Sequence, residues 1–231
     1  MQRHVVVTEI ERAEPEVVDE LGRAGAATVH EAMGRRGFVG AGFRARQRGA
    51  RIAGSAVTVL SHPGDNLMTH AAVEQCREGD VLVVAMTAPS TDGGFGDLLA
   101  TALQVRGVRG LVTEAGVRDT AELRAMGFPV WSRHVSCQGP VKVHAGSVNV
   151  PVVLGGVVVR PGDVVCADDD GVVVVPRPDA PDVLGAARDR LAQEEVTRQR
   201  FEAGELGLDV YGLRAELERL GVEYVDRLEP S

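Results

Sequence analysis

The sequence predicts an α/β protein in which helices cover a parallel or mixed sheet. Short apolar runs alternate with segments of helical periodicity over residues 15–132, and Val-rich runs separated by glycine and proline turns follow over residues 141–176. A charged segment with helical character begins at about residue 181. Because the chain has 231 residues, we expect a single domain over residues 1–231, with a helical extension at its C-terminal end.

The first segment predicts a helix or a pair of helices. Apolar residues recur at helical spacing from Pro15, Gly25 interrupts the pattern, and the glycines between residues 34 and 40 end it. A strand–helix–strand unit follows. It consists of a strand at residues 56–60, a turn at 62–66, a helix at 67–77 and a strand at 81–85.

The same alternation continues along the chain. It predicts a loop through Gly93 and Gly94, a helix at residues 97–105, a strand at 110–113, a helix at 120–126 and a strand at 129–132. Parallel strands joined by helices account for this order, because a parallel pair needs a long crossover connection.

The β-rich segment predicts hairpins that close over the first half. Its turns are Gly155-Gly156, Pro161-Gly162-Asp163 and Asp168-Asp169-Asp170-Gly171. The three consecutive aspartates suggest a metal site, but a glycine placed directly after them, between two Val-rich runs, favours a hairpin turn. The helical end, up to about residue 220, is expected to break at Gly204, Gly207 and Gly212.

Charge and hydropathy argue against two kinds of partner. The formal net charge of -8 argues against a nucleic-acid surface, which needs clustered basic side chains. No run approaches the roughly 18 to 20 apolar residues of a membrane span, and residues 1–5 contain no apolar stretch typical of a signal peptide. We therefore expect a cytoplasmic protein without nucleic-acid or membrane partners.

Two segments at predicted strand-to-helix junctions contain the residues that indicate a ligand-binding or catalytic site. They are Gly93-Gly94-Phe95-Gly96-Asp97-Leu98-Leu99 and Gly116-Val117-Arg118-Asp119. Ligands of α/β proteins bind in loops at the carboxyl ends of strands, and backbone amides at a helix N-terminus bind anions. We expect a substrate carboxylate to lie on the amides of Leu98 and Leu99.

Asp97, Arg118 and Asp119 predict metal-assisted chemistry. Carboxylates suit Mg²⁺ or Mn²⁺, and Mg²⁺ takes only one or two of them while it keeps several waters. Arg118 offers a planar fork to a carboxylate or enolate oxygen. Together, a metal and an arginine stabilise the negative charge that develops on a small 2-oxo acid as a carbon–carbon bond breaks.

Each of these segments has an ordinary alternative explanation. A glycine-rich loop before a helix can bind a nucleotide phosphate or only turn the chain. Asp119 followed by Thr120 is also typical of a helix cap beside a surface arginine. The two segments gain weight from their spacing relative to each other.

That spacing resembles a known family. Asp97, the 20 residues from 98 to 117, and Arg118-Asp119 are similar to the Asp-X20-Arg-Asp signature of the class II pyruvate aldolases, the 4-hydroxy-4-methyl-2-oxoglutarate and 4-carboxy-4-hydroxy-2-oxoadipate aldolases of aromatic catabolism. Further matches, spread over most of the chain, are Gly64-Asp65-Asn66, residues 79–84, Pro161-Gly162-Asp163, residues 168–176 and residues 204–209. The regulator of ribonuclease E activity A belongs to the same superfamily.

The resemblance implies a fold, an assembly and a reaction. The fold is an α-β-β-α sandwich of the ribonuclease E regulator-like type, assembled as a homotrimer or homohexamer with sites at subunit interfaces. The reaction is metal-dependent cleavage of a 4-hydroxy-2-oxo di- or tricarboxylic acid to pyruvate and a second 2-oxo acid. Oxaloacetate decarboxylation is implied as a side activity, because it passes through the same pyruvate enolate.

The resemblance also implies residue roles. Asp119 would ligate Mg²⁺ or Mn²⁺, Asp97 would hold a water bound to that ion, and Arg118 with the loop Gly96 to Leu99 would bind the pyruvyl portion of the substrate. Asn66 and Lys142 would contact the distal carboxylates. Glu194, or its neighbour Glu195, would be the catalytic acidic residue contributed by a second subunit.

Lys142 has alternatives of its own. It is the only lysine in the chain, so a Schiff-base aldolase could use no other residue. The plain alternative is a solvent-exposed strand lysine. Among the histidines, only His70, on the predicted helix after Asn66, is expected near the pocket.

Two other functions stay open. A protein of this superfamily can be a non-catalytic, protein-binding regulator of ribonuclease E. The glycine loop also suggests an S-adenosylmethionine-dependent methyltransferase, although the chain lacks the acidic residue that accompanies a nucleotide-binding glycine fingerprint.

Overall fold

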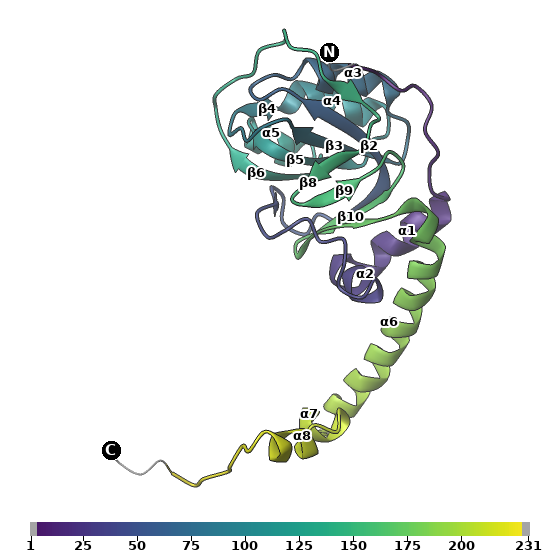
Figure 1. Cartoon of the computed structure of the whole chain (residues 1–231), viewed down its shortest axis with the longest axis vertical. Coiled ribbons are helices and arrows are strands. Elements are labelled where there is room, and N and C mark those ends of the chain that lie inside the picture. The colour runs from purple at the N-terminus through teal and green to yellow at the C-terminus, as the bar shows by residue number, and fades with distance from the viewer. Residues whose placement is uncertain (1–3, 228–231) are drawn as a thin grey trace. The chain divides into compact units, whose positions relative to one another are not determined.

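A nine-stranded mixed sheet is the framework of residues 4–227, the part of the chain described by the computed structural model (Figure 1). The strands are β1 Arg44–Ala45, β2 Ile52–Ser61, β3 Asp80–Met86, β4 Gly93–Phe95, β5 Gly110–Val117, β6 Val130–Val135, β7 Ser147–Val148, β10 Val164–Asp168 and β11 Gly171–Val175. Their order is β1-β6-β5-β3-β2-β10-β11, with β4 paired to β5 and β7 to β2. The central strands β2, β3, β5 and β6 are parallel, whereas β10 and β11 are antiparallel.

Helices and a second, two-stranded sheet complete the list of elements. The helices are α1 Pro15–Ala24, α2 Ala26–Ala32, α3 Leu67–Gln75, α4 Asp97–Val105, α5 Thr120–Ala125, the 3₁₀ turn η1 Arg177–Asp179, α6 Ala180–Glu202, α7 Gly207–Val210 and α8 Arg214–Arg219. The small sheet is the hairpin of β8 Val152–Leu154 and β9 Val157–Val159.

The layers follow from the alternation of side chains along the strands. In β3, Leu82 and Val84 face a core shared with α3, α4 and α5, whereas Val81 and Val83 face the opposite core, which β8 and β9 cover. A third core joins α1, α2 and the start of α6 to β10 and β11. Helices therefore lie outside two layers of strands, which confirms the predicted α-β-β-α sandwich (Figure 1).

The predicted helices and strands are confirmed, and two predictions, at residues 93–94 and at the end of β5, differ from the structure. Residue 25 separates two helices as expected, and α4 has the predicted bounds. The loop expected at Gly93 and Gly94 is instead the short strand β4, and β5 runs on to Val117. Gly93 pairs with Gly116 and Phe95 with Val117, so the two chemical segments of the sequence lie side by side. Glycine is required at position 116, because a Cβ there would lie less than 3.0 Å from backbone atoms of Thr91 and Asp92.

The three consecutive aspartates form the predicted hairpin turn between β10 and β11. Asp168 pairs with Gly171 across the turn, and its carboxylate accepts hydrogen bonds from the amides of Ala26 and Asp170. The carboxylate of Asp169 accepts from the amide of Gly49. These carboxylates tie backbone segments together, which agrees with the turn interpretation.

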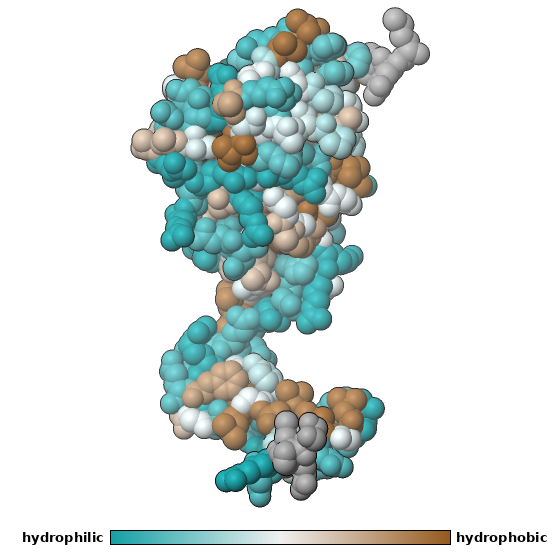
Figure 2. Space-filling model, turned by 90° about the vertical axis from the view of Figure 1, so that its left-hand side faces the viewer, coloured by the Kyte–Doolittle hydropathy of each residue, from teal (hydrophilic) through white to brown (hydrophobic). Residues whose placement is uncertain are grey.

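The chain divides into two compact units, residues 1–188 and residues 189–231. The second unit contains the end of α6 with α7 and α8, and Gly204 and Gly212 interrupt it at positive φ, as predicted. Gly207 is the first residue of α7 and does not break a helix. Between residues 189 and 227 no residue is buried, and Figure 2 shows apolar side chains on this unit's surface. Folding as a single domain stays a prediction.

From residue 4 to residue 227, no helix combines the length and the apolar composition needed to cross a bilayer.

Candidate active site

A cavity of about 180 Å³ lies at the carboxyl edge of the parallel strands, beyond the ends of β2, β4 and β5. Parallel strands end at the same edge of a sheet, which is where ligands of α/β proteins bind. The cavity gathers these residues singled out from the sequence: Asn66, Gly96, Asp97, Leu98, Leu99, Arg118 and Lys142. His70 and Pro140 also line it. Segments that are more than 70 residues apart in the sequence thus meet in one place.

Asp119 lies beside this lining in an unusual conformation. It precedes α5 with φ 52° and ψ 39°, a left-handed conformation that is uncommon for residues other than glycine and that concentrates at functional sites. Its side chain does not cap α5. Instead, Asp119 Oδ2 lies 3.4 Å from the amide nitrogen of Asp97 and 3.3 Å from Arg118 Nε. The helix-cap alternative for Asp119 is therefore wrong.

Gly96 is the residue that lets the two segments approach. A Cβ at this position would lie less than 3.0 Å from Asp119 Oδ2 and 3.2 Å from Arg118 Cγ. Its φ of -152° is ordinary extended backbone, so the requirement for glycine is one of space and not of conformation. The missing side chain places the Asp119 carboxylate against the start of α4.

The start of α4 already holds a carboxylate. Asp97 Oδ1 accepts a hydrogen bond of 2.8 Å from the amide of Leu98. The amides of a helix's first turn lack intrahelical acceptors and favour negative charge. The Asp97 oxygen thus occupies a position of the kind expected for a substrate carboxylate, while the Leu99 amide belongs to the same first turn.

Asn66 presents an unsatisfied polar atom. The residue is 6% exposed, and its Nδ2 donates to the carbonyl oxygen of Gly94 at 2.9 Å. Its Oδ1 is buried and has no hydrogen-bond partner among the described residues. A buried acceptor without a donor costs about 1 to 3 kcal/mol. Asn66 lines the cavity, so this unsatisfied oxygen belongs to a residue of the site.

Lys142 and His70 also line the cavity. Lys142 is exposed, as the plain alternative expects, but it lies in a segment without regular structure and not in a strand. Burial lowers the pKa of the His70 imidazole below its ordinary value, and the positive charge of Lys142 lowers it further. His70 therefore favours its neutral form. Its placement four residues after Asn66, on the same helical face, is the sequence signal for it.

The donor set fits a hard divalent cation with few protein ligands. Among the described residues, no group of three or more His, Cys, Asp or Glu side chains could hold a metal. Asp97 and Asp119 supply two carboxylates around the first turn of α4. Mg²⁺ commonly binds through one or two carboxylates and retains waters, whereas structural zinc sites use four Cys or His ligands.

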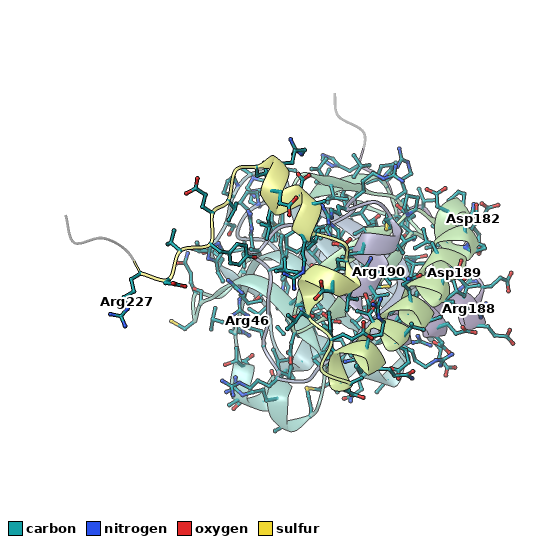
Figure 3. All side chains as sticks on the ribbon, turned by 90° about the horizontal axis from the view of Figure 1, so that it is seen from below. Arg46, Asp182, Arg188, Asp189, Arg190 and Arg227 are labelled. Carbon is teal, nitrogen blue, oxygen red and sulfur yellow. The ribbon has the colours of Figure 1, made fainter. Side chains whose placement is uncertain are left out.

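Glu194 lies in the second unit, on α6. Its Oε1 is 2.9 Å from Nε of Arg190, and α6 carries further charged side chains such as Arg188 and Asp189 (Figure 3). Glu195 accepts a hydrogen bond from Gln199 and pairs with Arg198. The contribution of either glutamate to a neighbouring subunit's site stays a prediction.

Larger cavities occur at the opposite edge of the sheet. One of about 570 Å³ is lined by residues that include Asp19, Arg51 and Arg109. Arg109 pairs with Asp19 and donates to the carbonyl oxygen of Ala53, and Arg51 donates to that of Arg23. None of the residues predicted for the site lies there. We therefore assign the site by its chemistry and not by volume.

Comparison with known proteins identifies the family. A family model described as RraA-like, Aldolase/RraA, matches residues 16–174. The chain belongs to this family. Over 170 residues, 74% of this chain and 79% of the relative, it is 31% identical to a Halalkalibacterium halodurans protein provisionally named 4-hydroxy-4-methyl-2-oxoglutarate aldolase.

Solved structures of similar proteins have other names. RraAS2 of Streptomyces coelicolor, described as an unusual member of the RNase ES inhibitor RraA family, is 32% identical with a TM-score of 0.76, over 83% of this chain and 100% of that one. A Geobacillus kaustophilus structure named S-adenosylmethionine:2-dimethylmenaquinone methyltransferase is 32% identical with a TM-score of 0.54, over 58% of this chain and 83% of that one. These names differ, so function within the family has to be argued from the site.

Proposed function

We propose that this protein is a divalent-metal-dependent aldolase that cleaves a 4-hydroxy-2-oxo di- or tricarboxylic acid to pyruvate and a second 2-oxo acid. Substrates such as 4-hydroxy-4-methyl-2-oxoglutarate and 4-carboxy-4-hydroxy-2-oxoadipate have this form. One observation carries the proposal: Asn66, Asp97, Arg118 and Lys142 line a single cavity, and the Asp119 carboxylate lies beside that lining, 3.3 Å from Arg118 Nε.

In this proposal the pyruvyl half of the substrate lies against Arg118 and the start of α4. Asp119 would ligate Mg²⁺ or Mn²⁺ and Asp97 would hold a water bound to that ion, and the ion would supply Lewis acidity toward the 2-oxo oxygen. Arg118 orients the substrate and neutralises the charge that develops on that oxygen. In the first turn of α4 the Leu98 amide already donates to Asp97 Oδ1, so the Leu99 amide would bind the 1-carboxylate.

The distal half of the substrate lies against Asn66 and Lys142. Lys142 pairs with a distal carboxylate as an ammonium ion and forms no imine with the substrate. In the reaction the 4-hydroxyl group loses its proton, the C3–C4 bond breaks, and its electron pair remains in the enolate of pyruvate. The enolate then takes a proton at C3. Oxaloacetate loses CO₂ through the same enolate, which makes decarboxylation a side activity.

The test is pyruvate release from a 4-hydroxy-2-oxo acid by the purified protein. We expect activity that EDTA abolishes and that Mg²⁺ or Mn²⁺ restores, because the charge on the enolate needs a Lewis acid. We also expect that borohydride added with pyruvate traps no adduct. Inhibition of ribonuclease E by a protein that releases no pyruvate with either metal would favour the regulator function. A borohydride-trapped adduct on Lys142 would contradict the metal-dependent mechanism.

We also propose that the protein is a homotrimer or homohexamer. None of residues 189–227 is buried, although Leu206, Leu220 and Val222 are large and apolar. A segment without buried apolar surface does not offset its own conformational entropy, so packing against another copy would stabilise it. Sedimentation at micromolar concentration should therefore give an oligomer, and a fully active monomer would contradict this proposal.

A further inference from the structure

Residues 136–146 carry Pro140 and Lys142 to the cavity, yet this segment has almost no regular structure of its own. It connects β6 to β7, and only Val141 takes part in an isolated bridge, with Asp65. The five residues from Val141 to Ala145 are all exposed. Apolar packing therefore contributes little to its position, and hydrogen bonds have to hold it.

The buried carboxylate of Asp65 supplies those hydrogen bonds. Its Oδ2 accepts from the amide of Val143 at 2.7 Å and from that of His144 at 2.8 Å, and it lies 3.2 Å from His144 Nδ1. Its Oδ1 accepts from the amide of Leu67, in the first turn of α3, at 2.7 Å. Asp65 is 1% exposed. One carboxylate thus joins the start of α3 to the residue that directly follows Lys142.

Further contacts surround this anchor. The amide of Val141 donates to the carbonyl oxygen of Gly64, and the amide of Asn66 donates to that of Val141. The ring of His144 stacks on that of His62, with 4.1 Å between centroids. Burial by itself raises the pKa of the Asp65 carboxyl, but the amides of Val143, Leu67 and His144 and the His144 ring outweigh it and lower the pKa to about 2. The anchor is therefore an anion at neutral pH.

We propose that Asp65 is a positioning residue that fixes Lys142, and with it the binding of the distal carboxylate of the substrate. The inference rests on the proposed function. Asp65 does not line the cavity. It acts through the segment that it holds, so its loss should affect the distal half of the substrate more than the pyruvyl half.

The first experiment separates the two halves with Asp65→Asn. An amide has a single acceptor oxygen, so it cannot serve Leu67 and the two amides of the segment together. We expect KM for aldol cleavage to rise by about 10-fold or more, the value of one lost charge-assisted hydrogen bond, with a smaller change in kcat. Exchange of the methyl protons of pyruvate with solvent deuterium, measured with Mg²⁺, should stay within about 2-fold of wild type, since it needs only the pyruvyl half. An equal loss in both reactions would overturn the proposal.

A double-mutant cycle identifies the route of the effect. If Asp65 acts through Lys142, then Asp65→Asn combined with Lys142→Ala should raise KM no more than Lys142→Ala alone. Additive effects would overturn the proposal. His144→Phe is the matched control, because it keeps the backbone amide and an aromatic ring on His62 and removes only the Nδ1 contact. It should change KM by less than about 2-fold.

Hydrogen exchange in the unmodified protein keeps the proposal testable if Asp65→Asn does not fold. The amides of Val143 and His144 should exchange at least about 10-fold more slowly than that of Ala145, an exposed neighbour, because only the first two donate to the buried carboxylate. Equal exchange of all three would overturn the anchoring role. If the wild-type protein exchanges pyruvate protons and cleaves no aldol, the proposed function fails, while slow exchange at Val143 and His144 would still support the anchor.

Discussion

The two halves of the candidate active site are constructed in different ways. The pyruvyl half comes from two segments that follow paired strands, β4 and β5, and Gly96 lets Asp119 lie against the start of α4. The distal half comes from α3 and from an exposed segment without regular structure, which a buried carboxylate holds in place. The first half depends on close approach of backbone, and the second on hydrogen bonds, several of which go to one buried carboxylate. Their tolerance to substitution should therefore differ.

The largest effect is expected at Arg118, which serves the pyruvyl half. Arg118→Ala should lower the rates of aldol cleavage and oxaloacetate decarboxylation by roughly 10² to 10³, or about 3 to 4 kcal/mol, as for other preorganised charge-stabilising donors. Calorimetric titration should show that the metal still binds, since the carboxylates remain. Arg118→Lys should restore little, because an ammonium ion does not reproduce the planar fork. Near wild-type rates for Arg118→Ala in both reactions would contradict the enolate-stabilising role.

A smaller but still large effect is expected at Gly96. Gly96→Ala places a methyl group against Asp119 Oδ2, so metal affinity and turnover should fall together, by an amount of the order of 10-fold to 100-fold if the misfit costs about 1 to 3 kcal/mol. Gly185→Ala is the matched control, because it makes the same change away from the cavity and a Cβ there would meet nothing within 4 Å. If both variants lost activity equally, close approach at Gly96 would not be the cause.

The smallest effect concerns stability in acid and tests the distal half. The pKa of Asp65 is lowered to about 2, so its ionised form stabilises the folded state at pH values above its ordinary pKa near 4. As the pH falls from about 4 to about 2, this contribution, on the order of 2 kcal/mol, should be lost. Chemical denaturation at a series of pH values measures it. Asp65→Asn should be less stable than wild type at pH 6 and should approach it near pH 2. A constant difference over this range would argue against an ionised anchor.

The sequence predicted the features that depend on residues close together in the chain. The helix Asp97–Val105, the helix break at Gly25 and the turn at Asp168–Gly171 follow from residue types and spacing, and the spaced aspartates and arginine do lie together. What could not be predicted depends on contacts between distant segments. β4 forms only because β5 extends beside it, and the role of Asp65 needs the amides of residues 78 and 79 positions away. Nothing in the sequence indicates that the side-chain oxygen of Asn66 is buried without a hydrogen-bond partner.

The single lysine of this chain makes the cavity accessible to chemical labelling. Lys142 is exposed and is the only side-chain amine in the sequence, so an amine-reactive reagent can modify no other side chain of this type. The Lys142 amine can therefore report on the distal half of the site without any substitution in the protein. The rate of acylation at Lys142, followed by mass spectrometry of the peptide that contains it and so separated from the α-amine of the chain, would measure occupancy of the cavity. Competition by a series of dicarboxylates would then rank candidate substrates before any catalytic assay is available.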